Sequence, residues 1–257
     1  MKIFLCQDSI QGILSGVYDA WASREGHGNV CLALAENHDM ELFAEYVSVR
    51  PDYEKAEKVL RTLRKRMHWE DFLAVYRAVL SQERSKADSI YRVIVLALHT
   101  ERRILDHLEQ QDVYRVFSMA RKVGNEAARY LEFVRFRELE NGALFSEIQP
   151  ENQVLPLIGD HFANRLPLEN FLIYDSRHRV SLFHAPGHPW ILMDTPDEFE
   201  VKKLRFSREE GEMSRSWQAF FEQIAIEERR NKRLQQQFLP LKFRAYMTEK
   251  FEKNKEI

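Results

Sequence analysis

The chain has 257 residues, of which 44% are hydrophobic and 30% are charged, and its formal net charge is −2 at pH 7. This length allows one large domain or two closely packed ones, and the composition is typical of globular proteins, not of disordered or fibrous ones. A net charge near zero argues against a strong overall attraction to nucleic acid.

The charges are nevertheless arranged in blocks of alternating sign. The net charges of four successive segments are −4 for residues 1–50, +5 for 51–137, −8 for 138–201 and +5 for 202–257. Such blocks suggest a basic helical surface and a separate acidic module. Charged helix faces are most often simply solvated, so a polyanionic partner is one of two open interpretations.

The first apolar run, residues 2–6, is too short for a signal peptide or a membrane span, which predicts a soluble, cytoplasmic protein with no membrane partner. The two cysteines, Cys6 and Cys31, lie in strand-like apolar runs, where buried free thiols are expected. Two cysteines with this spacing cannot hold an iron–sulfur cluster, and no phosphate-loop or zinc motif is present. We therefore expect no cofactor and no metal.

The first part of the chain predicts a β-α-β segment followed by a central helical bundle. A helix with an N-cap at Asp8 is expected to run to about Ala22, between strands at residues 2–6 and 30–34, and a third strand is expected at 43–49. Apolar residues then recur every three or four positions, which predicts helices at 52–67, 69–81, 87–98 and 111–130. The first of these helices has a basic side, formed by Lys55, Lys58, Arg61 and Lys65.

After Tyr130 the spacing of the apolar residues becomes typical of strands. Residues 133–139 are predicted to form a strand, Asn141-Gly142 a two-residue hairpin turn and residues 143–149 the returning strand. The elements expected after this hairpin are a helix at about 152–164, a second hairpin formed by 171–174 and 179–184, one long helix at 207–238 and a final segment at 243–251.

The expected fold class is therefore α+β: an N-terminal β-α-β segment, a central helical bundle, a hairpin-helix-hairpin module and a long C-terminal helix. Two domains are expected, residues 1–130 and 131–257. They are packed closely, and a single domain is the alternative.

The first hairpin suggests a phosphate-binding surface. With a two-residue turn, Arg137 would lie opposite Ser146 and Arg135 opposite Ile148, so that both arginines share one face. Adjacent guanidinium groups on a rigid strand suit bidentate contact with phosphate. The alternative is that acidic side chains of a neighbouring element neutralise them.

Two groups of residues have spacings that could serve catalysis or metal binding. Asp160, His161 and Arg165 share one predicted helix and could supply a carboxylate, a base and an anion-binding group. The more ordinary interpretation is a histidine packed under the sheet and bonded to a backbone carbonyl. His184 and His188 are spaced like zinc ligands, but the proline and glycine between them prevent the helical turn that a zinc pair needs.

Several segments together resemble one bacterial family, described as probable DNA metabolism proteins. The resemblance covers nearly the whole chain and is carried by residues 133–139, 160–167, 171–175, 230–235, Pro240 and 246–249. It implies two partners, namely DNA and a radical S-adenosylmethionine protein of DNA modification or repair that is encoded nearby. A related domain is fused to uracil-DNA glycosylase-like proteins, but the glycosylase half has no counterpart here.

We therefore expect an accessory protein in DNA repair or modification that binds DNA, the radical enzyme, or both. The candidate DNA-binding residues are Arg135, Arg137, Arg165, Arg230, Asn231, Lys232 and Arg233, with Asn231 favoured as the cap of a turn. One alternative is a nucleic-acid-processing enzyme in which Asp160, His161 and Asp175 lie near one another. The other alternative is a protein-only scaffold whose acidic module binds a basic partner.

Overall fold

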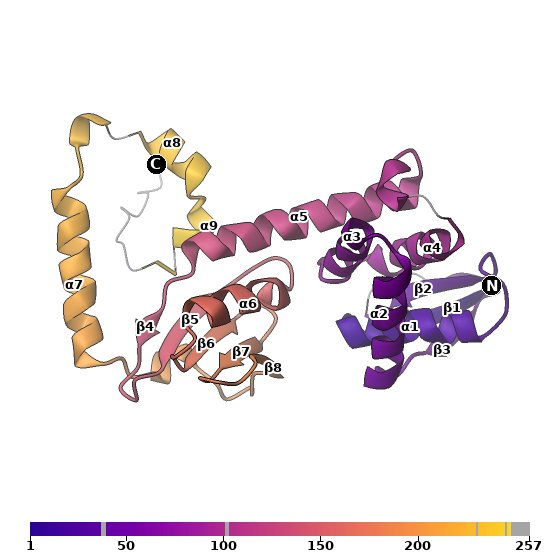
Figure 1. Cartoon of the computed structure of the whole chain (residues 1–257), viewed down its shortest axis with the longest axis horizontal. Helices are drawn as coiled ribbons and strands as arrows, with labels where there is room; N and C mark the ends of the chain where they lie inside the picture. Colours follow the sequence, from indigo (N-terminus) through magenta and orange to yellow (C-terminus); the bar gives the residue numbers. More distant parts are fainter. Residues whose placement is uncertain (37–39, 101–102, 230, 245, 248–257) are drawn as a thin grey trace. The chain divides into compact units, whose positions relative to one another are not determined.

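The computed structural model of the chain describes residues 1–36, 40–100, 103–229, 231–244 and 246–247 (Figure 1). The chain divides into two compact units, Met1–Glu126 and Ala127–Ile257. Each unit has its own hydrophobic cluster and its own sheet. Helices and strands occur in both units, which confirms the α+β class.

The first unit is built on a parallel three-stranded sheet. The strand order is β2-β1-β3, so β1 (Lys2–Cys6) lies between β2 (Val30–Leu34) and β3 (Glu45–Ser48). This sheet confirms the predicted β-α-β start. The third strand begins two residues later than expected because Phe43 has a φ of 63°, a left-handed conformation that a strand cannot contain.

Helix α1 (Ile10–Ala22) connects β1 to β2 and packs against β1. Its N-cap is Ser9, whose hydroxyl accepts a hydrogen bond from the Gly12 backbone N–H at 3.0 Å. The prediction of Asp8 as the cap is therefore wrong. The Asp8 carboxylate instead forms an ion pair with the fully buried Lys86 ammonium at 2.6 Å, because a buried cation requires a charged partner.

The four helices expected after the third strand are all confirmed, with ends within three residues of the predicted ones. They are α2 (Tyr53–Arg66), α3 (Trp69–Val79), α4 (Lys86–His99) and α5 (Gln111–Phe133), with a short 3₁₀ helix at Ile104–Asp106 before the last. Helix α5 begins in the first unit and ends in the second. The apolar faces of α1, α3 and α4 form most of the first core.

The second unit contains a five-stranded sheet in the order β4-β5-β6-β7-β8. Helix α6 (Leu155–Arg165) connects the parallel neighbours β5 and β6, and its Ile158 and Phe162 belong to the same buried cluster as Ile173. The other strand pairs are antiparallel. The strands are β4 (Arg137–Glu138), β5 (Leu144–Ile148), β6 (Phe171–Asp175), β7 (Val180–His184) and β8 (Ile191–Asp194).

The first hairpin differs from its prediction in length and in register. Helix α5 continues to Phe133, β4 contains only two residues, and Arg137 pairs with Phe145 instead of with Ser146. The Leu139 backbone N–H bonds to the carbonyl of Ala143, so the loop contains three residues, with Gly142 at a φ of 80°. This additional loop residue shifts the register by one position.

The C-terminal part also departs from the predicted pattern. Strand β8 was not predicted. The prediction of a single helix at 207–238 is wrong, because this region forms two helices with a break between them. The second of these begins anew because the Asn231 side chain accepts a hydrogen bond from the Leu234 backbone N–H. The elements of this region are α7 (Arg208–Gln223), α8 (Lys232–Phe238), α9 (Leu241–Arg244) and two 3₁₀ helices, Val201–Lys203 and Glu227–Arg229.

Most of the predicted final segment, 243–251, lies outside the described residues. Within the ranges given above, none of the helices has both the length and the apolar character that crossing a membrane requires.

Candidate nucleic-acid interface

The C-terminal half of α2 has an uninterrupted basic surface. Residues 58–66 include no acidic side chain and five exposed cations, which are Lys58, Arg61, Arg64, Lys65 and Arg66. Ala56 and Leu63 of the same helix are buried, so the apolar stripe points to the core and the cations point to solvent. The exposed Lys58, Arg61 and Lys65 confirm this part of the basic side predicted for the helix, whereas Lys55 is half-buried and forms an ion pair with Asp19 at 2.7 Å.

The five cations differ in their partners. Arg61 forms a loose ion pair with Glu57 at 3.6 Å, and the Arg64 guanidinium lies 5.7 Å from the centre of the Trp69 ring. Among the described residues, no ion pair engages Lys58, Lys65 or Arg66. Like charges one helical turn apart repel each other by about 0.2–0.5 kcal/mol, so a bound polyanion would relieve this repulsion.

A hollow of 580 Å³ lies beside this basic surface, between α1, α2 and α4. This volume is within the range of small-molecule sites. The lining is mainly apolar, and none of the lining residues is acidic. The lining residues are Val17, Tyr18, Trp21 and Ala22 of α1, Lys58, Val59, Thr62, Leu63 and Arg66 of α2, and Ile94, Leu98 and His99 of α4.

An aromatic cluster forms one wall of the hollow. The Trp21 side chain is 39% exposed. The His99 ring is stacked on it, with centroids 6.2 Å apart and an interplanar angle of 27°. The His27 ring also contacts the indole, at 4.5 Å between centroids. Of this cluster, Trp21 and His99 line the hollow, so aromatic side chains lie next to the cations of α2.

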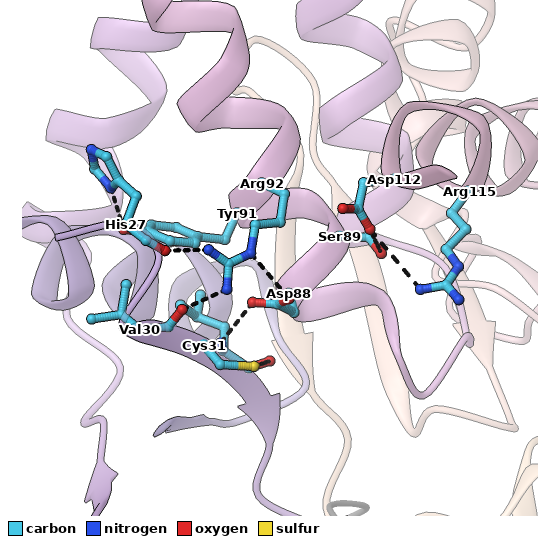
Figure 2. Close-up of polar contacts among 10 residues, drawn as sticks. His27, Val30, Cys31, Asp88, Ser89, Tyr91, Arg92, Asp112 and Arg115 are labelled. Carbon is cyan, nitrogen blue, oxygen red and sulfur yellow. Dashed lines mark hydrogen bonds and ion pairs between the residues drawn. The ribbon is translucent and has the colours of Figure 1, made fainter. Parts of the chain in front are cut away.

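Hydrogen bonds behind this wall hold the aromatic cluster in place (Figure 2). His27 Nδ1 is 2.8 Å from the hydroxyl of the fully buried Tyr91. The pKa of His27 is lowered mainly by burial and further by His99 and Arg92, so the imidazole is neutral at pH 7. Burial raises the pKa of Tyr91, so its hydroxyl stays protonated.

Arg92 joins α4 to the loop that carries His27 (Figure 2). Its guanidinium donates to the carbonyls of His27 and Val30, the latter at 2.6 Å, and forms an ion pair with Asp88 at 3.3 Å. The other Asp88 oxygen accepts a hydrogen bond from the Leu32 backbone N–H at 3.2 Å. This network fixes the position of the loop before β2, and with it the position of His27 against the indole.

The two arginines predicted to share a strand face do not do so. Arg135 lies before β4, and its guanidinium donates to the carbonyls of Glu132 at 2.9 Å and Val134 at 3.2 Å. The Arg137 guanidinium lies 3.9 Å from the centre of the Phe206 ring. Burial lowers the pKa of Arg137, while the nearby carboxylates of Glu210 and Glu147 raise it. Acidic side chains thus lie near Arg137, as the alternative interpretation expects, although no ion pair engages its guanidinium among the described residues.

The remaining predicted DNA-binding residues lie in other elements of the second unit. Arg165 is exposed at the C-terminal end of α6, and Lys232 and Arg233 are exposed in the first turn of α8. The preferred interpretation of Asn231 as a cap is confirmed. Arg230 lies outside the described residues. That these residues bind DNA stays a prediction.

The three residues proposed for catalysis have separate partners. The Asp160 carboxylate accepts a hydrogen bond from the Trp190 indole N–H at 2.6 Å. The exposed His161 ring packs edge-on against Phe162. Asp175 is buried and is 2.7 Å from Nδ1 of His178. Among the hydrogen bonds and ion pairs of the described part of the chain, none joins Asp175 to the other two.

In the described ranges, no group of three or more His, Cys, Asp or Glu side chains is placed to hold a metal ion. His184, one of the two histidines with metal-like spacing, is buried and bonds through Nδ1 to the carbonyl of Glu169 at 3.0 Å.

Sequence reasoning missed the aromatic wall of the hollow. Trp21 follows Val17 by four positions and therefore continues the apolar stripe of α1, so its place in the sequence predicts burial and does not signal its exposure. His27 and His99 carry no signal either, since they lie in separate segments that only the tertiary fold brings together.

The fold and this site define an α+β protein with a basic helical face and an adjoining aromatic hollow. The family described as a domain of unknown function, DUF4130, matches residues 84–249. This is more than half of the chain, so the chain belongs to that family. The match includes α4, whereas α1 and α2 precede it.

Two other comparisons add little. No curated protein shows a significant match to the chain. One solved structure, described as a member of a family of ribosomal proteins with a DHH domain, is 16% identical and has a TM-score of 0.31. The alignment covers 55% of this chain and 34% of that one, so the chain spans about a third of that structure. This likeness is too weak to support an argument about fold or function.

Proposed function

We propose that this is an accessory protein of DNA repair or modification that binds DNA through the basic face of α2. The observation that carries the proposal is the run of five exposed cations in residues 58–66, of which Lys58, Lys65 and Arg66 have no carboxylate partner within the described residues. The resemblance to probable DNA metabolism proteins favours DNA over other polyanions. It also suggests a radical S-adenosylmethionine enzyme as the partner that supplies the chemistry.

The dimensions of the basic face suit a nucleic-acid backbone. Nine helical residues span about 12 Å between the first and the last Cα. One strand of a duplex presents roughly three phosphates over that length. Two or three simultaneous phosphate contacts would be strongly salt-dependent, because each contact releases condensed counterions from the DNA.

The test compares two triple variants that remove the same charge. In R61Q/R64Q/K65Q the basic face is weakened while every residue that lines the hollow is kept. In R165Q/K232Q/R233Q the exposed cations predicted from the sequence are removed instead. Affinity for single-stranded and duplex DNA is measured across a salt series, and circular dichroism confirms that each variant is folded.

We expect the α2 variant to bind DNA more weakly. For duplex DNA, the slope of log K against the logarithm of the salt concentration should decrease in magnitude by about two to three. The second variant should keep the wild-type slope. An unchanged slope in the α2 variant, or an equal change in both variants, contradicts the assignment. Binding of the radical enzyme without any DNA binding would favour the scaffold alternative.

One contact favours the enzyme alternative. The buried Asp175 carboxylate accepts hydrogen bonds from the backbone N–H groups of Arg177 and His178 and orients the His178 ring through Nδ1, as in a carboxylate–histidine pair of a general base. Turnover of DNA by the purified protein, with and without added divalent metal, that is lost in H178A would support this candidate. Absence of turnover in both proteins would exclude it.

A further inference from the structure

We propose that the hollow between α1, α2 and α4 holds an unpaired nucleobase of the DNA strand bound along α2. This inference rests on the proposed DNA binding and adds the form of DNA that is recognised. The hollow and the basic face share Lys58 and Arg66, so a ligand in the hollow is adjacent to the cations that would contact its backbone.

The walls of the hollow have the chemistry of a stacking site. Trp21 and His99 offer aromatic surfaces at one side, and Val59, Leu63 and Ile94 offer aliphatic ones. Stacking of a base on an aromatic side chain contributes about 1–3 kcal/mol and tolerates different bases. A base that is paired within a duplex keeps both faces covered by its neighbours, so only an unpaired base can use this wall.

The charges around the hollow favour a base that is attached to phosphates over a purely apolar ligand. Lys58 and Arg66 are eight residues apart and therefore lie about two helical turns apart on one side of α2. Both are exposed and both line the hollow, which has no acidic lining residue. A nucleotide whose base enters between them would have its 5′ and 3′ phosphates within reach of one cation each.

A polar hydrogen-bonding edge is also available. His99 Nδ1 bonds to the Val95 carbonyl at 2.7 Å, which leaves Nε2 as the ring atom able to meet a ligand. The Thr62 hydroxyl donates to the Lys58 carbonyl at 2.8 Å and retains its acceptor capacity. These groups could satisfy polar atoms of a base edge without excluding any one base.

The test uses a perfectly paired duplex and two bulged duplexes of equal charge, one with a single-nucleotide bulge and one with an abasic bulge. We expect the wild-type protein to bind the base bulge about 5- to 150-fold more tightly than the abasic bulge, which is the stacking energy above converted to affinity. W21A should lose this preference and keep the salt dependence. W217A is the matched control, since the Trp217 indole is 43% exposed but lies in the second unit, and it should keep the preference.

A second variant, T62W, tests the same hollow without truncating Trp21, so the test stays decisive if W21A does not fold. T62W introduces a large side chain at an exposed position of α2 that lines the hollow, and therefore fills the site without removing any contact of the core. T62W should abolish the preference for the base bulge as well. The inference is overturned if the wild type binds both bulges equally while its salt slope remains, or if W21A and T62W keep the preference. Absence of any salt-dependent DNA binding would instead overturn the proposed function itself.

Discussion

The Cys6 thiol shows how burial couples a single residue to pH. It is completely buried, and burial, assisted by Asp19 and Cys31, raises its pKa to about 12. In the unfolded chain the thiol loses its proton near pH 9, whereas in the folded protein it keeps the proton. The folded state thus binds more protons above pH 9, and the free energy of unfolding must fall as pH rises through that range.

We expect the alkaline loss of stability to be smaller in C6A than in the wild type. The difference in slope should approach about 1.4 kcal/mol per pH unit between pH 9 and 10.5, because one proton is involved. Urea unfolding at a series of pH values measures it. Lys86, whose pKa is lowered by burial, acts in the opposite direction in both proteins, so it cancels in the comparison. Equal slopes would contradict the assignment to Cys6.

Arg92 supports a second prediction at the scale of one residue. R92M removes the hydrogen bonds to the carbonyls of His27 and Val30 and leaves Asp88 without its cation. We expect the free energy of unfolding to fall by about 2–3 kcal/mol, since hydrogen bonds to charged groups contribute about 1.5–3 kcal/mol. R115M is the control, because Arg115 is exposed and its Asp112 contact is 4.0 Å long; it should cost below about 0.5 kcal/mol. Similar losses in both variants would argue against the role given to Arg92.

At the scale of the elements, the close packing of α1 on β1 depends on one glycine. A Cβ at Gly16 would lie 2.2 Å from Cys6 Sγ, and no side chain can occupy that space without displacing the sulfur. We expect G16A to destabilise the protein by about 1–3 kcal/mol, which is the usual cost of overpacking a core.

The cost of G16A should shrink in the C6A background, where the sulfur is absent and alanine has the better helix propensity. The four proteins of this double-mutant cycle are compared by urea unfolding. Additive effects of the two substitutions would show that the packing of α1 on β1 is not limited by this contact. The same C6A protein thus serves both stability experiments.

The elements that sequence analysis predicted well are those whose pattern is local. In α2, for example, the positions of Ala56 and Leu63 and the cations between them already indicate which side is buried. The first hairpin was misplaced because one additional loop residue changes the register without changing the composition. Strand β8 has no alternating pattern, since Ile191, Leu192 and Met193 are all exposed. Its short apolar run does not alternate with polar residues as a strand with one solvent-facing side usually does, so sequence analysis did not assign it.

At the scale of the whole molecule, the difference between local patterns and tertiary packing explains which part of the candidate site could be predicted from the sequence. The basic face lies within one helix and was predicted from the sequence. The hollow requires α1, α2 and α4 to meet, and its His27–Tyr91 hydrogen bond joins residues 64 positions apart. Such convergence depends on tertiary packing, so the sequence alone did not predict the hollow.

The two separate hydrophobic clusters lead to a prediction about unfolding. Ile94 belongs to the cluster of the first unit and Ile173 to that of the second, and both are fully buried. I94A and I173A should each cost about 2–5 kcal/mol, and each should shift a different phase of the urea transition. Circular dichroism and tryptophan fluorescence, recorded on the same samples, resolve the phases. A single common transition shifted equally by both variants would contradict two independent cores.

The strand order of the first sheet has a consequence for the newly made chain. The central strand, β1, is synthesised before both of its neighbours, and the last residue of β3 follows the end of β1 by about forty residues. At ordinary translation speeds this delay is roughly 2–8 s. Both edges of this apolar strand are unpaired until β2 has been made, and one edge stays open until β3 follows, a state that favours association with other chains. The nascent protein should therefore depend on chaperones most strongly before β3 emerges from the ribosome.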